Sequence, residues 1–160
     1  YPLDHDGYRA AWEYADAHAL PVLSHSYFAG DSLRVFAAMA AAYPNATVII
    51  GHAGLDLGLD RVARVVAEHP NVLLDLCGTL THRGVLESLL DLVGADRLMF
   101  GSDMPFISGS RQLGTIVTAS LDPDARAAIL GLTATRVFRL DDDLQALAPA
   151  PPLPAQNGRQ

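Results

Sequence analysis

Four side chains that can bind a metal or carry a proton follow short apolar runs in this sequence: His25, His52, Cys77 and Asp103. They are separated by 27, 25 and 26 residues, so they recur with a nearly constant period. Imidazole and carboxylate groups bind zinc, manganese and iron, and catalytic metal sites combine such ligands with an open position for water. His25, His52 and Asp103 are therefore candidate ligands of one metal ion.

Each of these residues also has an ordinary structural interpretation. A single His after a strand is more often hydrogen-bonded than metal-bound, and a single Asp there usually caps a helix. His25, His52 and Asp103 all follow apolar runs at a nearly constant spacing, which favours one shared metal site over three unrelated structural roles. Cys77 is interpreted as a small buried hydrophobic residue. A metal-free hydrolase that uses Cys77 is a weaker alternative, because no His–Cys pairing signature accompanies it.

The apolar runs that precede these residues predict four strands, at 21–25, 47–51, 72–76 and 98–101. The runs are continuously apolar, which is typical of parallel strands covered by helices. Amphipathic segments between them predict helices, one capped by Asp31 and another over 85–93. We expect the strands to be parallel and in chain order, with the helices on the outer face.

In parallel α/β folds, ligands bind at the C-terminal ends of the strands, where the four reactive residues are expected. The period is close to the roughly 31 residues per unit of an eight-unit (β/α)8 barrel. Four units would make half of such a barrel. Its two outer strands would then have unpaired edges, which promote association, so we expect a homo-oligomer.

Composition limits the possible partners. The net charge is −7, which argues against nucleic acid or an anionic membrane surface as a partner. No apolar run approaches the roughly 20 residues that cross a bilayer. A single cysteine fits a reducing cytoplasm. We expect a small-molecule substrate.

The end of the sequence has a different character. Residues 107–114 are predicted to form a loop, and Asp122 with Pro123 is predicted to begin a closing helix. Residues 1–145 are assigned to one α/β domain. The Ala/Pro-rich segment 146–160 is predicted to be a disordered tail.

The runs "PVLSH", "VIIGHAG", "NVLLDLCG" and "RLMFGSDMPF" resemble, in this order and spacing, the amidohydrolase superfamily. The resemblance extends from about residue 1 to 140 and is closest to the amidohydrolase-related (type 2) hydrolases and decarboxylases. It implies a (β/α)8 barrel, of which these runs look like strands five to eight. It also implies that His25 and Asp103 bind metal, that Asp103 accepts a proton from water, and that His52 is a ligand or an acid/base.

One departure from the family pattern is that no His-x-His pair, which the family carries on strand one, occurs in this sequence. The resemblance implies a metal-dependent hydrolase acting on a small carboxylate, amide or lactone through a metal-activated water. The alternatives are a decarboxylase of the same family and a non-catalytic module. The 160 residues alone, which we expect to be part of a longer protein, are expected to be inactive.

The metal implied by the resemblance is zinc first, with manganese or iron as alternatives. Three aromatic residues just beyond the strand ends, Tyr27, Phe28 and Phe106, are predicted to form an apolar wall of the substrate pocket. For Phe106, packing in the core is an equal alternative.

Overall fold

A computed structural model describes residues 2–26, 31–78 and 84–140 of the chain. Four parallel strands form one sheet in chain order: β1 (Pro21–Ser24), β2 (Thr47–Ile50), β3 (Val72–Asp75) and β4 (Leu98–Met99). This confirms the predicted strand order and direction. The strands are shorter than predicted, and Asp75 rather than Leu76 ends β3.

Helices connect and follow the strands. The α-helices are α1 (Arg9–Ala17), α2 (Ser32–Ala42), α3 (Leu59–Glu68), α4 (Val85–Val93), α5 (Gly109–Thr118), α6 (Pro123–Ala127) and α7 (Thr133–Phe138). Shorter helical segments are η1 (Asp6–Tyr8), η2 (Gly51–Leu57), η3 (Ala95–Arg97) and the π-helical η4 (Ala128–Leu132). The helix predicted over 85–93 is confirmed as α4. No helix in the described part of the chain combines the length and apolarity needed to span a membrane.

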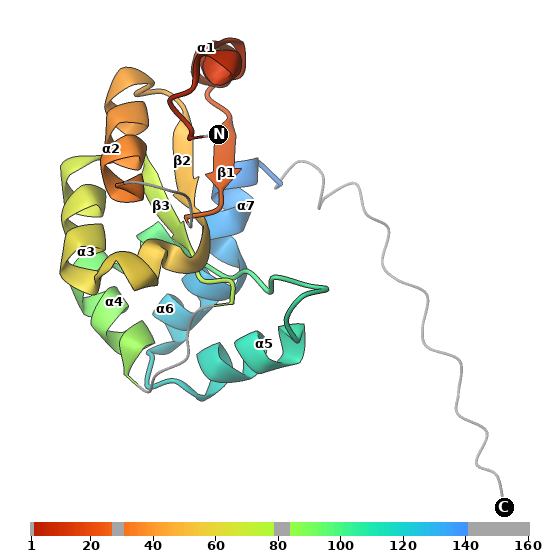
Figure 1. The fold of residues 1–160 in the computed structure, drawn as a ribbon. Coiled ribbons are helices and arrows are strands. Elements are labelled where there is room, and N and C mark those ends of the chain that lie inside the picture. The colour runs from red at the N-terminus through yellow and green to blue at the C-terminus, as the bar shows by residue number, and fades with distance from the viewer. Residues whose placement is uncertain (1, 27–30, 79–83, 141–160) are drawn as a thin grey trace, which may run out of the picture.

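The main core lies on one face of the sheet, where α2, α3 and α4 cover it (Figure 1). Phe36 from α2, Val62 from α3 and Leu89 from α4 are fully buried there with strand residues such as Ile50 and Leu74. Helix starts follow local chemistry, because Asp31 Oδ1 accepts the Arg34 N–H at 3.3 Å and Asp122 Oδ1 accepts the Ala125 N–H at 2.8 Å. Both predicted caps are confirmed.

The opposite face of the sheet carries a smaller cluster. Ile49, Leu73 and Met99 are buried on this face, and Ala134 and Val137 of α7 pack against them. Figure 1 shows α7 across the sheet from α2 and α3. Helices therefore cover both faces of this sheet, whereas outer helices alone were expected. In this chain, α7 shields the apolar side chains of the second face.

The outer edge of β4 is occupied. The Leu98 N–H donates to Ala95 O, and the Phe100 N–H donates to Ile129 O at 2.8 Å. At the other end of the sheet, Thr47 N donates to Leu20 O, so in the alternating ladder of a parallel pair the polar groups of Leu23 point away from β2. The Leu23 side chain is 57% exposed. On the same side, Pro21 has no N–H and the Ala19 carbonyl accepts a hydrogen bond from Arg139 at 2.9 Å. The two edges predicted to be unpaired therefore differ, and among the described residues the open part of the β1 edge is at Leu23.

Loss of a fully buried strand side chain should test the main core. Replacing Ile50, which is 0% exposed, with Ala is expected to lower the free energy of unfolding by about 2–5 kcal/mol. The matched control is Leu92→Ala on α4, where the side chain is 48% exposed and the expected loss is small. Urea unfolding followed by circular dichroism measures both. Equal losses in the two variants would contradict this packing.

Candidate active site

Two predicted site residues meet just after β1 and β2. The ring centroids of His25 and His52 lie 4.7 Å apart, and the ring planes are nearly perpendicular at 82°. His52 is held in the left-handed region, with φ of 58°, at the start of η2. This turn follows β2 directly and brings the His52 ring beside the residue that follows β1. The structure thus brings together two of the three predicted ligands.

Asp103 and His52 both border a small space beside Gly78, which has no side chain to fill it. A Cβ built on Gly78 would lie 3.0 Å from both Asp103 Oδ2 and His52 Nδ1. Gly78 also has φ of 70°, so a side chain there would be strained as well as crowded. Asp103 itself has φ of 58°, a conformation that Asp tolerates better than most residues. These backbone turns place the carboxylate and the imidazole beside the same small space.

The donor types at the strand ends fit a divalent metal, because they are two imidazoles and a carboxylate. The hydroxyl of Ser26, next to His25, is buried and has no hydrogen-bond partner in the described part of the chain, which indicates unmet polar capacity at this end. Within residues 2–26, 31–78 and 84–140, however, no group of three or more His, Cys, Asp or Glu is arranged to hold a metal ion. The three-residue ligand set therefore stays a prediction.

Asp75 is a buried acid that the sequence reasoning overlooked. It is 9% exposed, and burial raises the pKa of its carboxyl, while hydrogen bonds from Cys77 and the nearby His52 oppose that shift. The charge of Asp103 also raises the pKa of Asp75, because two nearby carboxylates repel each other. The signal was visible in "NVLLDLC", where one acid interrupts an otherwise apolar strand.

Cys77 is buried, as predicted, at 8% exposure. Burial raises the pKa of its thiol to about 12, and the neighbouring carboxyl of Asp75 adds to this effect. A thiol that stays protonated is a poor nucleophile. The environment of Cys77 therefore disfavours the alternative of a metal-free hydrolase that uses it.

Cys77 should resist alkylation in the folded protein. Its thiolate forms only as the pH approaches the raised pKa of about 12, so the iodoacetamide reaction should stay slow at pH 8, well below the rate of an ordinary thiol. Mass spectrometry of the labelled protein, with a urea-unfolded sample as the reference, measures this. Equal labelling rates in the two samples would show that the thiol is accessible and activated.

The predicted apolar wall is only partly described. Tyr27 and Phe28 lie outside the described residues, as does the segment 146–160. Phe106 follows Asp103 by three residues and is 88% exposed, so its packing in a core is wrong for the described part of the chain. A role for Phe106 at the mouth of the site stays a prediction.

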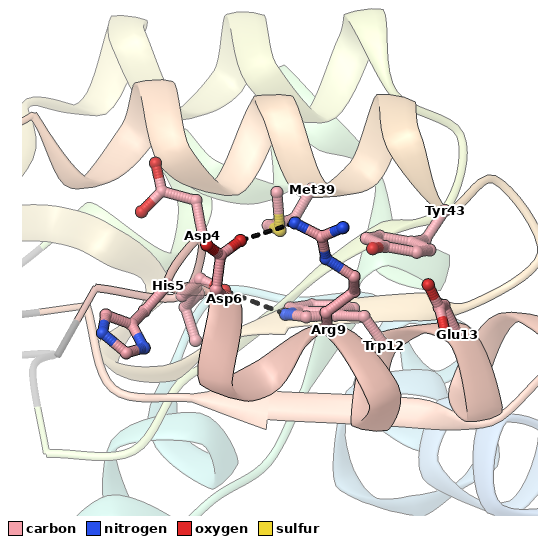
Figure 2. Close-up of a pocket in the computed structure, with 9 residues that line it drawn as sticks. Asp4, His5, Asp6, Arg9, Trp12, Glu13, Met39 and Tyr43 are labelled. Carbon is pink, nitrogen blue, oxygen red and sulfur yellow. Dashed lines mark hydrogen bonds and ion pairs between the residues drawn. The ribbon is translucent and has the colours of Figure 1, made fainter.

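A separate cavity of about 290 Å3 lies between the N-terminal segment, α1 and α2, away from the strand ends (Figure 2). Trp12 and Tyr43 stack in its wall with ring centroids 5.5 Å apart, and Trp12 Nε1 donates to Leu3 O at 3.0 Å. The Arg9 guanidinium extends into it and pairs with Asp6 at 2.6 Å. These contacts fasten the N-terminal segment to α2, which is a structural role.

Comparison with known proteins places this site in context. The model of the amidohydrolase family matches residues 1–140. An L-fucono-1,5-lactonase from Burkholderia ambifaria is 30% identical, over 68% of this chain and 47% of the relative. The chain thus spans about half the length of this relative.

Solved structures show the same fold. A TIM-barrel protein from Bordetella bronchiseptica gives a TM-score of 0.74 at 18% identity, covering 87% of this chain and 52% of its own. A dihydroxybenzoic acid decarboxylase from Polaromonas with bound manganese gives 0.69 at 19% identity, covering 86% and 55%. An amidohydrolase from Burkholderia multivorans with bound zinc gives 0.65 at 23% identity, covering 86% and 58%. The four-stranded sheet is therefore a partial TIM barrel.

Proposed function

Because this chain belongs to the amidohydrolase family, we propose that it supplies strands five to eight of a metal-dependent hydrolase acting on a small carboxylate, amide or lactone. The observation that supports this most is the contact of the His25 and His52 rings, with centroids 4.7 Å apart, at adjacent strand ends. The nearness of His52 and Asp103 to Gly78 adds a carboxylate at the same end of the sheet.

The proposed roles follow from the chemistry of each group. The chemistry that a bound divalent metal supplies in such a site is a lowered pKa of water and a polarised substrate carbonyl. His25 and Asp103 hold the metal, with His52 as a further ligand or as the acid/base. Asp103 accepts a proton from the attacking water, and His52 donates a proton to the leaving oxygen or nitrogen. Zinc is the first candidate and manganese the second, in line with the metals bound by two structures of this fold.

A lactone is the first substrate class to test, because the relative at 30% identity is an L-fucono-1,5-lactonase. Lactone hydrolysis breaks the ring C–O bond, adds water and releases an acid. Tyr27, Phe28 and Phe106 are proposed to line the apolar side of the substrate pocket. A small aromatic carboxylate, which such a wall suits, also lies within the proposed class.

A decarboxylase is the second candidate, because the fold is also that of a dihydroxybenzoic acid decarboxylase. Here the bond broken is C–C, the product is carbon dioxide, and the acid/base group delivers a proton to the carbon. The same His52 and Asp103 would serve, so the products must decide between the two reactions.

The test follows acid release from L-fucono-1,5-lactone and related lactones in a pH-stat, and carbon dioxide release from dihydroxybenzoates. Acid release above the spontaneous rate, abolished by a chelator and restored by zinc or manganese, is the expected result. Carbon dioxide release without lactone hydrolysis would replace the hydrolase with the decarboxylase. The 160 residues alone are expected to be inactive, so the assay compares them with the longest protein that the gene encodes.

A further inference from the structure

Asp75 occupies an unusual position for a carboxylate. It ends β3 on the face of the sheet that carries Leu73 and Met99, with Met99 directly beside it on β4. Only 9% of the residue is exposed. Burying a charged group is costly unless hydrogen bonds compensate it, so an acid at this position calls for a specific partner.

The partner is Cys77, which bonds to Asp75 through its main-chain N–H and through its thiol. Asp75 Oδ1 accepts the Cys77 N–H at 3.0 Å. The carbonyl oxygen of the same residue, Cys77, lies 3.1 Å from the ring nitrogen Nδ1 of His52, and the main-chain N–H of His52 donates to Cys77 Sγ at 3.4 Å. Asp75 therefore holds Cys77 at its N–H, while the carbonyl of Cys77 contacts the His52 ring.

The contact to the carbonyl determines which ring nitrogen of His52 carries the proton. Nδ1 also lies 3.7 Å from Cys77 Sγ, but the carbonyl oxygen at 3.1 Å is the shorter contact. A carbonyl oxygen only accepts hydrogen bonds, so this shorter contact is a hydrogen bond only when Nδ1 carries the proton. In the neutral ring, Nδ1 then bears the hydrogen, and Nε2 is the unprotonated nitrogen. The geometry at Cys77 thus makes Nε2 the nitrogen that can bind a metal or, in an acid/base role, take up a proton first and then donate it to the leaving group.

The neighbouring strand makes room for this arrangement. A Cβ on Gly101 would overlap Oδ1 of Asp75 and would lie 2.7 Å from its Cγ. Gly101 follows β4 by two residues, next to the end of β3. Gly101 is needed here for space, because any side chain would displace the carboxylate of Asp75.

We infer that Asp75, seated against Gly101, is a positioning residue that holds the Cys77 peptide so that His52 keeps its proton on Nδ1 and presents Nε2. The catalytic use of this ring state rests on the proposed function, but the ring state itself does not. It is tested on the imidazole itself, without substrate or metal. An inactive protein with the inferred ring state would count against the proposed function alone.

The experiment uses the full chain labelled with 15N-histidine at about pH 8.5, where an ordinary imidazole is neutral. Long-range 1H–15N spectra distinguish the two neutral tautomers, and a His52→Gln variant identifies the His52 signals among the six histidines. The wild type is expected to show the Nδ1–H pattern. Asp75→Ala is expected to shift most of the population to Nε2–H, whereas Asp75→Asn, whose Oδ1 can still accept the Cys77 N–H, should retain Nδ1–H.

Gly101→Ala provides an independent variant. Its methyl group should displace Asp75 and reproduce the shift seen in Asp75→Ala. The matched controls are Gly114→Ala, where a Cβ meets nothing within 4 Å, and Asp122→Ala, which removes another carboxylate that accepts a main-chain N–H. Both controls are expected to leave His52 unchanged.

An unchanged His52 pattern in Asp75→Ala, with the other histidines at their wild-type positions, would overturn the inference. If Asp75→Ala does not fold, Gly101→Ala and Asp75→Asn decide. Loss of the Nδ1–H pattern in Gly101→Ala and its retention in Asp75→Asn support the inference. Any other combination of these two results overturns it.

Discussion

In the longer protein, where activity is expected, replacing Asp103 with Asn should lower kcat of the proposed reaction by about 10²- to 10⁴-fold, the usual contribution of a general base. An amide cannot accept the proton of water, and it is a weaker metal ligand than a carboxylate. The fold should survive, because Asn tolerates the left-handed conformation that Asp103 adopts at φ of 58°. Steady-state rates and thermal unfolding of the variant measure the two effects.

The matched control for Asp103→Asn is Asp96→Asn. Asp96 has a side chain that is 76% exposed and lies 3.8 Å from the Arg97 guanidinium, at the surface. The same loss of charge should leave kcat unchanged there. If Asp103→Asn keeps the wild-type rate while both variants are folded, Asp103 is neither the base nor an essential ligand.

His52→Asn is expected to reduce turnover by about 10²-fold or more, while the amount of bound metal falls by less. The reason is that an acid/base acts on the substrate, whereas a ligand acts by retaining the ion. Asn is again the suitable replacement, because His52 has φ of 58°. Metal analysis of the dialysed protein and kcat measured with excess metal separate the two roles.

His18→Asn serves as the control for the loss of an imidazole. His18 caps the end of α1 and packs against Tyr14, on the first helix rather than at the strand ends. Its replacement should affect neither metal content nor turnover. Parallel loss of metal and rate in His52→Asn, restored by excess metal, would identify His52 as a ligand instead.

The sheet was predictable because its signals are local and repeated. Each βα unit carries its own continuous apolar run, and the near-constant period fixes chain-order parallel pairing. The caps Asp31 and Asp122 were also predictable, because a capping carboxylate accepts the main-chain N–H of a residue only three positions further along the chain.

Helix α5 was missed for a physical reason. Its first half, within 107–114, is rich in Gly and Ser, which favour loops when considered alone. Tertiary packing overrides that preference: Gln112 and Ile116, one turn apart, are both buried. Gln112 Nε2 also donates to Leu76 O at 2.7 Å, and no propensity argument can anticipate this long-range bond.

The site was predicted in outline but not in detail. The period placed His25, His52 and Asp103 at strand ends, and the two imidazole rings do meet. The role of Gly101 and the burial of Asp75 depend on the close approach of β3 and β4, which no spacing encodes. A single acid within an apolar run, such as Asp75, does indicate that a buried carboxylate needs a close partner.

The unequal edges of the sheet have a consequence for polymerisation. A sheet with two open edges can add copies without limit. In the part of the chain that the structure describes, this sheet can be extended at Leu23 of β1 but not at β4, because the outward N–H groups of Leu98 and Phe100 are already bonded. Two copies that pair through β1 around a two-fold axis would leave no second edge to continue from. Light scattering is therefore expected to show an assembly that stops at the dimer, and Leu23→Pro, which removes an outward N–H, should return it to the monomer.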